Sequence, residues 1–339
     1  MKSKLLEVAH LKTHFATENG SVTAVDDVSF TVEKGEVVGV VGESGCGKSV
    51  TAESILRLLD EKSTNFEGEI NFEGINLLSL SKNAMRKIRG NEISMIFQDP
   101  MSSLNPVYTV GNQIMESLLL HQDLSNKEAY QKAIEMLRVT GIPLPEKRVD
   151  EYPHELSGGM RQRVMIAMAL SCQPKLLIAD EPTTALDVTT QAQILELILE
   201  MKNKFNMGTI LITHDLGVVA EVCTRVVVMY LGQVIEETDV KSLFMNPYHP
   251  YARGLLNSIP HIDEASDEDL YVIQGTVPTL HNIPIGCRFA PRCEYADDLC
   301  HSEMPQLEVV DENSKVRCWH YKEIYKKEGD RIDLEYIEA

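Results

Sequence analysis

Short apolar runs alternate with glycine-rich or acidic turns along much of this chain. Val37 to Val41 is a β-branched apolar run, and Leu176 to Ala179 is a second apolar run. Such runs are typical of strands buried on both faces of a parallel sheet. The apolar residues from Val164 to Leu170 and the composition of Ser49 to Leu59 favour helices instead. The pattern therefore predicts an α/β fold.

A glycine-rich turn joins the first predicted strand to the first predicted helix. Its sequence, GESGCGKS, fits G-x-x-x-x-G-K-S, and we call Gly42 to Ser49 the phosphate loop. Glycines let the backbone approach phosphates closely, Lys48 would reach the β and γ phosphates, and the Ser49 hydroxyl would bind Mg²⁺. An accidental glycine-rich turn is the alternative, but it would not require this order of strand, turn and helix. The predicted ATP-binding residues are Gly42, Ser44, Gly45, Cys46, Gly47, Lys48, Ser49 and Val50.

The second apolar strand ends in two acids, Asp180 and Glu181. In a phosphate-loop fold such a strand lies beside the first strand. That arrangement would place Asp180 near Mg²⁺ and Glu181 where it could polarise an attacking water. Alone, the pair could mark an ordinary strand end, but a complete phosphate loop in the same chain makes that interpretation weak.

The stretch LSGGM precedes the predicted helix at Val164 to Leu170. Its residues are Leu156, Ser157, Gly158, Gly159 and Met160. Ser157 and the first N–H groups of the helix could bind an anion, although a simple helix cap explains the same residues. With the phosphate loop this makes two anion-binding helix starts. One ATP does not require both on one chain, so we expect two chains to supply half a site each.

The order of these motifs resembles that of ABC-type ATPases, in which LSGGM is the signature motif. The resemblance implies a RecA-like core with a helical subdomain and an antiparallel β part, working as head-to-tail pairs that enclose ATP. It also implies catalytic roles for Glu181, for His214 in LITHD and for Gln98 in IFQDP, with Gln98 and Asp180 near Mg²⁺. Asp187 in TALD would face the partner, and Phe15 would stack on adenine; a packed strand residue is the alternative for Phe15.

Composition limits the remaining classes of function. The chain has 339 residues, enough for two or three domains, and no apolar run near the ~18 residues of a membrane span. The N-terminus lacks the apolar core of a secretory signal, so we expect a cytoplasmic protein. A formal charge of −19 and a single ATPase cassette argue against nucleic acid as a partner, and hence against a soluble ABC ATPase acting on nucleic acid. A stand-alone redox protein would leave the cassette unexplained.

Three longer stretches, GESGCGKSVTAESILRLL, IFQDPMSSLNPVYTVGNQIMESL and NPYHPYARGLLNSIP, resemble the D-type ATP-binding subunit of bacterial oligopeptide and dipeptide importers. The resemblance covers roughly residues 5 to 322. It implies ATP-driven peptide uptake, two permeases gripped by a helical subdomain near residues 99–170, a homologous F-type ATPase subunit forming a heterodimer, and an extracytoplasmic peptide-binding protein. The chain would then lie at the cytoplasmic face of the membrane. Nickel-import relatives leave a metal chelate open as the cargo.

Four of the seven cysteines lie near the C-terminus, namely Cys287, Cys293, Cys300 and Cys318. We expect an ATPase domain over residues 1–261, then an acidic linker and a small cysteine-bearing domain over 262–325, and a charged tail over 326–339. A metal centre would stabilise so small a domain. The wide spacing lacks the C-x2-C pairs typical of structural zinc and permits a [4Fe–4S] cluster, which the family resemblance also implies. Zinc or reduced, packed thiols are the alternatives.

Overall fold

The computed structural model describes residues 3–18, 20–99, 103–184, 186–259 and 271–328. The chain divides into two compact units, which we describe separately. The first unit comprises Met1–Leu6, Thr31–Val37 and Asn71–Ile212; the second comprises Glu7–Phe30, Val38–Ile70 and Thr213–Ala339. The predicted linker at residues 262–270 lies outside the described residues, as do residues 329–339 of the predicted tail.

In the described part of the first unit, three strands form a parallel sheet. They are β6 (Ile93–Ile96), β7 (Leu176–Asp180) and β8 (Gly208–Ile212), and every residue in them is buried. Ile93 pairs with Leu176, and Leu176 pairs with Gly208. Because both faces are covered, the strands are continuous apolar runs without alternation. The predicted strand from Leu176 to Ala179 is therefore β7, which extends one residue further to Asp180.

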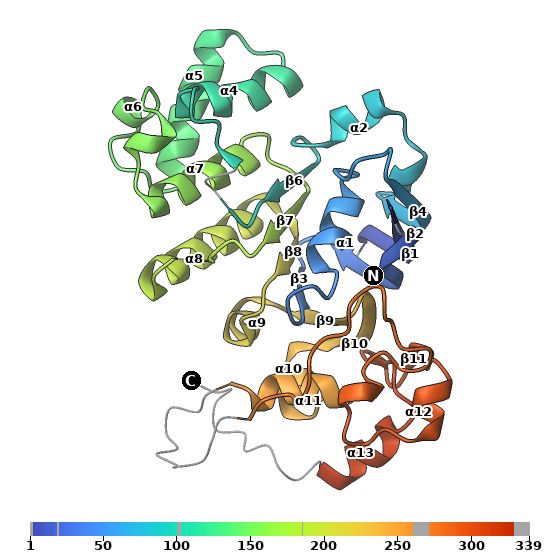
Figure 1. Ribbon diagram of the computed structural model, residues 1–339. Helices are drawn as coiled ribbons and strands as arrows, with labels where there is room; N and C mark the ends of the chain where they lie inside the picture. Colours follow the sequence, from blue (N-terminus) through green and yellow to red (C-terminus); the bar gives the residue numbers. More distant parts are fainter. Residues whose placement is uncertain (1–2, 19, 100–102, 185, 260–270, 329–339) are drawn as a thin grey trace. The chain divides into compact units, whose positions relative to one another are not determined.

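A group of helices follows β6 and precedes β7 in the sequence, and it gathers at the upper left of Figure 1. The group contains α4 (Val110–His121), α5 (Asn126–Val139), α6 (Pro145–Arg148) and α7 (Gly158–Leu170), and α5 packs against both α4 and α7. Thr109, Ser125 and Ser157 cap α4, α5 and α7 through their hydroxyls. Such caps contribute about 1 kcal/mol each. The remaining elements of this unit are β5 (Ile75–Asn76), η1 (Leu77–Ser79), α2 (Lys82–Ile88), η2 (Pro153–Glu155) and α8 (Val188–Phe205).

The sheet of the second unit begins with a parallel pair and continues with antiparallel strands. β3 (Val37–Val41), buried throughout, pairs in parallel with β9 (Arg225–Tyr230), and β9 pairs with β10 (Gln233–Asp239). β10 also pairs with β12 (Lys315–Val316), and β12 pairs with β11 (Glu308–Val309). Its helices include α1 (Lys48–Ile55), α9 (Leu216–Val222), α10 (Val240–Met245) and α11 (Pro250–Asn257).

Three longer strands have a different hydrophobic pattern. They are β1 (Lys4–Thr17), β2 (Gly20–Glu33) and β4 (Thr64–Phe72), and they are neighbours in the order β2, β1, β4. Along much of β1 and β2, buried residues alternate with partly exposed ones. A period of two is expected for an antiparallel sheet with only one face against a core. These strands carry the predicted adenine contact, Phe15, which is half-buried in β1.

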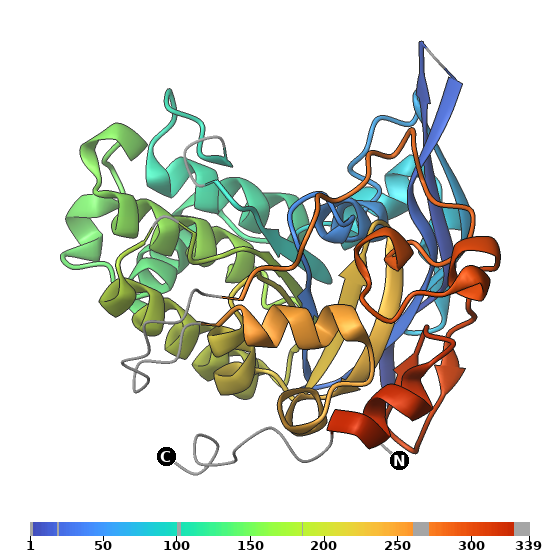
Figure 2. The same ribbon diagram turned by 60° about the horizontal axis from the view of Figure 1, so that its bottom comes forward.

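The C-terminal segment shares the core of the second unit. Ile273 and Phe289 are buried in the same cluster as Tyr230 and Tyr251, and Cys287 and Cys293 pack against that cluster. Further along, η3 (Ala290–Arg292), α12 (Asp298–Ser302) and α13 (Tyr321–Glu328) lie beside α10 and α11, as Figure 2 shows. The prediction of a separate small cysteine-rich domain is therefore not supported. Its few apolar residues are buried against the strands and helices that precede them.

Candidate nucleotide-binding site

The phosphate loop connects β3 to α1 within the second unit. Gly42 has φ 148° and Gly47 has φ 98°, a region that L side chains rarely adopt. A Cβ at Gly42 would lie 2.2 Å from the Met229 carbonyl oxygen, and a Cβ at Gly47 would lie 2.9 Å from the Ala24 carbonyl oxygen. The motif thus requires glycine at these positions for both conformation and space. α1 begins at Lys48 and ends at Ile55, earlier than the predicted end at Leu59.

Lys48, the next-to-last residue of the phosphate loop, is buried. Its Nζ donates to the carbonyl oxygens of Gly42 at 2.7 Å and Glu43 at 3.1 Å. A bound phosphate would offer stronger, charge-assisted acceptors to the same ammonium. Cys46 is buried, and burial raises the pKa of its thiol. Ser44 and Gly45 are exposed, and Ser49 and Val50 are partly exposed.

His214 belongs to the same unit as the phosphate loop. The preceding residue, Thr213, donates its backbone N–H to the carbonyl oxygen of Val40 at 3.2 Å. Asp215 caps α9 by accepting from the N–H groups of Gly217 and Val218. His214 is therefore held at the carboxyl end of β3, where the phosphate loop starts, and it is exposed. Both residues at its sides are fixed by hydrogen bonds, so its backbone position is well defined.

In the first unit, the two predicted catalytic residues Gln98 and Glu181 are in contact. Gln98 Nε2 donates to Glu181 Oε2 at 2.8 Å, and the Thr184 hydroxyl donates to the same oxygen at 2.9 Å. Glu181 follows directly after β7 and has φ 46°, which is uncommon for a residue other than glycine. Its backbone N–H donates to the Ile212 carbonyl at the end of β8. Asp180, the last residue of β7, is 5% exposed.

The signature residues Leu156–Met160 start α7 in this unit. Ser157 is the N-cap and accepts from the Met160 N–H at 3.4 Å. Ser157 and Gly158 are exposed, whereas Leu156 is buried. A Cβ at Gly159 would lie 3.3 Å from Thr190 Cγ2, so the start of α7 lies against the start of α8. Asp187 caps α8 and accepts from Thr190, and these hydrogen bonds lower the pKa of its carboxyl.

Sequence reasoning missed several contacts around these motifs. The Gln162 side chain donates to the Pro182 carbonyl, which ties the signature helix to the residues after Glu181. Thr184 orients Glu181, as described above. Glu43, an unassigned position of the phosphate loop, contacts Tyr251 and Arg292. The partners of Glu43 lie more than 200 positions away and belong to no motif, so no local pattern indicates them.

The four C-terminal cysteines line one small cavity together with His249, Trp319 and His320. Burial raises the pKa of Cys293 and Cys318 to about 12 and also raises the pKa of Cys287 and Cys300. Cys172 and Cys223 are not among the residues that line this cavity, and burial raises the pKa of each.

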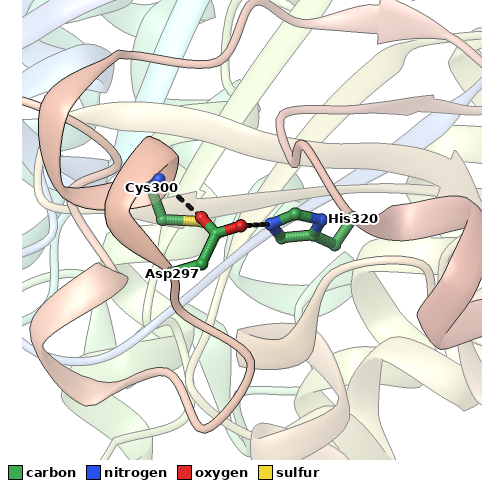
Figure 3. Close-up of side chains that lie close together, drawn as sticks. All are labelled: Asp297, Cys300 and His320. Carbon is green, nitrogen blue, oxygen red and sulfur yellow. Dashed lines mark hydrogen bonds and ion pairs between the residues drawn. The ribbon is translucent and has the colours of Figure 1, made fainter.

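A mixed set of ligand atoms lies at the edge of this cavity, shown in Figure 3. Asp297 Oδ1 accepts from the Cys300 N–H at 3.0 Å, and Asp297 Oδ2 lies 2.9 Å from His320 Nε2. These contacts lower the pKa of Asp297 to about 2, the Cys300 N–H being the largest cause. Within the described ranges, this Asp, Cys and His set is the group with metal-ligand spacing. This mixed set differs from the four cysteine thiolates that hold a [4Fe–4S] cluster.

Two family profiles match the sequence. The profile described as ABC transporter matches residues 25–184, and the profile described as oligopeptide/dipeptide transporter, C-terminal region, matches residues 235–300. The oligopeptide transport ATP-binding protein AppD of Bacillus subtilis is 55% identical over 95% of this chain and 98% of its own length. The probable peptide ABC transporter ATP-binding protein y4tR of Sinorhizobium fredii is 53% identical over 94% of this chain and 96% of its own.

This chain belongs to the family of oligopeptide and dipeptide ABC transporter ATP-binding proteins. The dipeptide transport ATP-binding protein DppD of Haemophilus influenzae is 50% identical over 93% of this chain and 94% of its own length. Among solved structures, the ATP-binding cassette MJ0796, a dimer bound to ADP and Pi, is 28% identical with a TM-score of 0.62. It covers 69% of this chain, and 98% of its own chain is matched. The predicted phosphate-loop ABC ATPase fold is confirmed.

Two predictions are wrong. A [4Fe–4S] cluster is not supported, because the relatives are described as ATP-binding proteins of ABC transporters and the described ligand set is Asp297, Cys300 and His320. A heterodimer with an F-type subunit is not supported either, because the solved cassette is described as a dimer of MJ0796 itself. Spacing among cysteines permits a cluster but does not establish the geometry of the thiols.

No helix among the described residues is long and apolar enough to cross a membrane.

Proposed function

We propose that this chain hydrolyses ATP to power the import of oligopeptides or dipeptides across the cytoplasmic membrane. The contact between Gln98 and Glu181 at the end of β7 carries the hydrolytic part of the proposal. It joins a carboxylate that can accept a proton from water to an amide that can orient the same water. The peptide cargo rests on relatives described as peptide, oligopeptide and dipeptide transport proteins, which match nearly the whole chain.

The predicted nucleotide-site residues have the following roles in this proposal. The phosphate-loop backbone and Lys48 bind the phosphates, Phe15 stacks on adenine, and His214 contacts the γ-phosphate at the end of β3. Mg²⁺ neutralises phosphate charge when bound, and the residues that would hold it are Ser49, Gln98 and Asp180. Their oxygen atoms are the ligands that Mg²⁺ prefers. Glu181, held by Gln98 and Thr184, accepts a proton from the attacking water.

The signature residues act on a second nucleotide-binding domain. Ser157 and Gly158 are exposed at the start of α7, and Asp187 lies at the start of the adjacent α8. Ser157 and the first N–H groups of α7 suit the γ-phosphate held by a partner's phosphate loop, and Asp187 faces the partner chain. Hydrolysis would remove that phosphate bridge and let the pair reopen, which is the motion that drives transport.

Permeases and an extracytoplasmic peptide-binding protein complete the importer, and the chain lies at the cytoplasmic face of the membrane. Residues 99–170, which include α4 to α7, form the helical subdomain that contacts the permeases. The nucleotide-binding domain spans 1–261, the C-terminal region 262–325 and the tail 326–339. The exposed Val107 and Tyr108 in the helical subdomain offer apolar surface for that contact.

Reconstitution tests this function. The chain would be purified in detergent with its permeases, placed in proteoliposomes, and assayed for ATP-dependent uptake of a labelled peptide library. We expect uptake that stops when Glu181→Gln is introduced. A chain that hydrolyses ATP without associating with permeases, or uptake of a nickel chelate in place of peptides, would contradict the peptide importer.

A further inference from the structure

Glu43, the second residue of the phosphate loop, is held at both its backbone and its side chain by residues more than 200 positions later. Its N–H donates to the Tyr251 hydroxyl oxygen at 2.7 Å. Its carboxylate accepts from both terminal nitrogens of Arg292, at 2.7 and 3.0 Å. A planar guanidinium that binds both carboxylate oxygens fixes their orientation and also compensates their negative charge. The C-terminal segment is thus in direct contact with the loop that binds phosphate.

Arg292 has little freedom to leave this position. Its side chain is 3% exposed, and its Nε donates to the Gln274 carbonyl at 3.0 Å. The guanidinium also lies 5.8 Å from the ring centre of Tyr230 and 6.0 Å from that of Phe289. The same two rings contact Tyr251 edge to face. The cation is therefore fixed in place before any ligand binds, which lowers the entropic cost of its contact with Glu43.

A carboxylate at this position opposes the function of the loop. The loop must bind a triphosphate of several negative charges, and an uncompensated Glu43 would repel it. The backbone of Glu43 matters as well, because its N–H is bonded to Tyr251 and its carbonyl oxygen accepts from Lys48. With both polar groups of residue 43 bonded, the backbone that leads into the exposed residues Ser44 and Gly45 is held in place.

We propose that Arg292 is a positioning residue for ATP binding. By neutralising and holding Glu43, and with Tyr251 fixing the backbone, it orients the phosphate loop and allows a polyanion to approach. Arg292 does not touch the nucleotide in this proposal; it acts through Glu43. The C-terminal region is accordingly part of the nucleotide site and sets the affinity of the chain for ATP.

Charge-deletion variants of the full-length chain test this role, with ATP hydrolysis measured as KM and kcat separately. We expect Arg292→Gln to raise KM about ten-fold or more at low salt while kcat changes much less, because the loss is one of charge compensation during binding. Arg292→Lys retains a charge without the planar fork and should give an intermediate KM. The increase should shrink at 0.5 M salt, since screening weakens the repulsion.

The decisive comparison is the double variant Glu43→Gln, Arg292→Gln. A neutral carboxamide needs no cation, so the double variant should regain most of the affinity that Arg292→Gln loses. Arg317→Gln is the matched control, because Arg317 is another buried C-terminal arginine. It is paired with Asp27 at 3.2 Å and donates to the Val234 and Pro305 carbonyls, none of which belongs to the phosphate loop. This variant should lower the thermal midpoint without raising KM. An Arg317→Gln enzyme with the same raised KM, or a double variant as weak as Arg292→Gln, would overturn the proposal.

Discussion

Gln98 donates a hydrogen bond to Glu181 across 2.8 Å, although the two residues are 83 positions apart. They follow the neighbouring strands β6 and β7, whose parallel pairing brings their carboxyl ends to one edge of the sheet. The Thr184 hydroxyl donates to the same Glu181 oxygen. An acceptor and its two donors are thus assembled in one compact unit.

Glu181→Gln should separate ATP binding from hydrolysis. Glutamine has nearly the same shape and can still accept from Gln98, but it cannot take a proton from water. We expect kcat to fall by about 100-fold or more, while the Kd for ATP changes little. Single-turnover kinetics and equilibrium binding of ATP measure the two effects. Undiminished turnover would remove Glu181 from the proposed role.

Gln98→Ala should reduce kcat by a smaller factor, and its effect should depend on Glu181. Because the two side chains share one hydrogen bond, the loss in the double variant Gln98→Ala, Glu181→Gln should be well below the product of the single losses. The measurement is kcat at saturating ATP for the wild-type chain, the two single variants and the double variant. Fully multiplicative losses would show that the two residues act independently.

The phosphate loop offers a steric prediction with an internal control. Gly42 and Gly74 both have positive φ, but a Cβ at Gly42 would meet the Met229 carbonyl oxygen at 2.2 Å, whereas a Cβ at Gly74 would meet nothing within 4 Å. Gly74→Ala should cost only the conformational strain, about 1–2 kcal/mol. Gly42→Ala adds a backbone clash and should abolish ATP binding. Equal effects of the two substitutions on ATP affinity and on the urea midpoint would contradict this account.

The phosphate loop was predictable because its chemistry is local. Strand, glycine turn, lysine and helix follow one another within about twenty residues, and the structure places them as expected. The two acids at the end of the second apolar run, Asp180 and Glu181, were predictable for the same reason. Gln98, Asp187 and His214 carry no local signal of their own, and only the motif order of the family indicated them.

The contacts made by Glu43 were not predictable. Carboxylates and arginines are common on protein surfaces, and nothing near Glu43 or Arg292 in sequence shows that they meet. The prediction of a separate cysteine-rich domain failed for a related reason. Its apolar residues, such as Phe289, appeared too few for a core, because the sequence does not show that they pack against Tyr230 and Tyr251.

Two adjacent buried groups, His249 and Glu236, should make the stability of the second unit depend on pH in opposite directions. Glu236 accepts the backbone N–H groups of Tyr248 and His249 at 3.0 and 2.7 Å, and Arg253 is the charged group near it. His249 Nδ1 accepts from the Tyr251 N–H at 3.0 Å. Burial raises the pKa of Glu236 to about 7 and lowers the pKa of His249 to about 3.

The signs follow from which state binds more protons. Between its unfolded and folded pKa values, His249 is protonated only in the unfolded chain, so the stability it contributes is complete above pH 6.5 and falls as pH drops toward 3. Between pH 4.5 and 7, Glu236 is protonated only in the folded chain, so its contribution falls as pH rises. In the shared window from pH 4.5 to 6.5 the two effects oppose each other in the wild-type chain.

Substituting either residue alone should reveal how the stability due to the other one changes with pH between 4.5 and 6.5. His249→Asn keeps an acceptor for Tyr251 but does not titrate, so the stability of this variant should fall as pH rises. Glu236→Gln should show the reverse, with stability that rises with pH. Each slope should approach, at most, about 1.4 kcal/mol per pH unit for one proton. Urea unfolding at pH 4.8, 5.5 and 6.2 measures them. If both variants keep the wild-type slope, neither buried group governs the stability of this unit between pH 4.5 and 6.5.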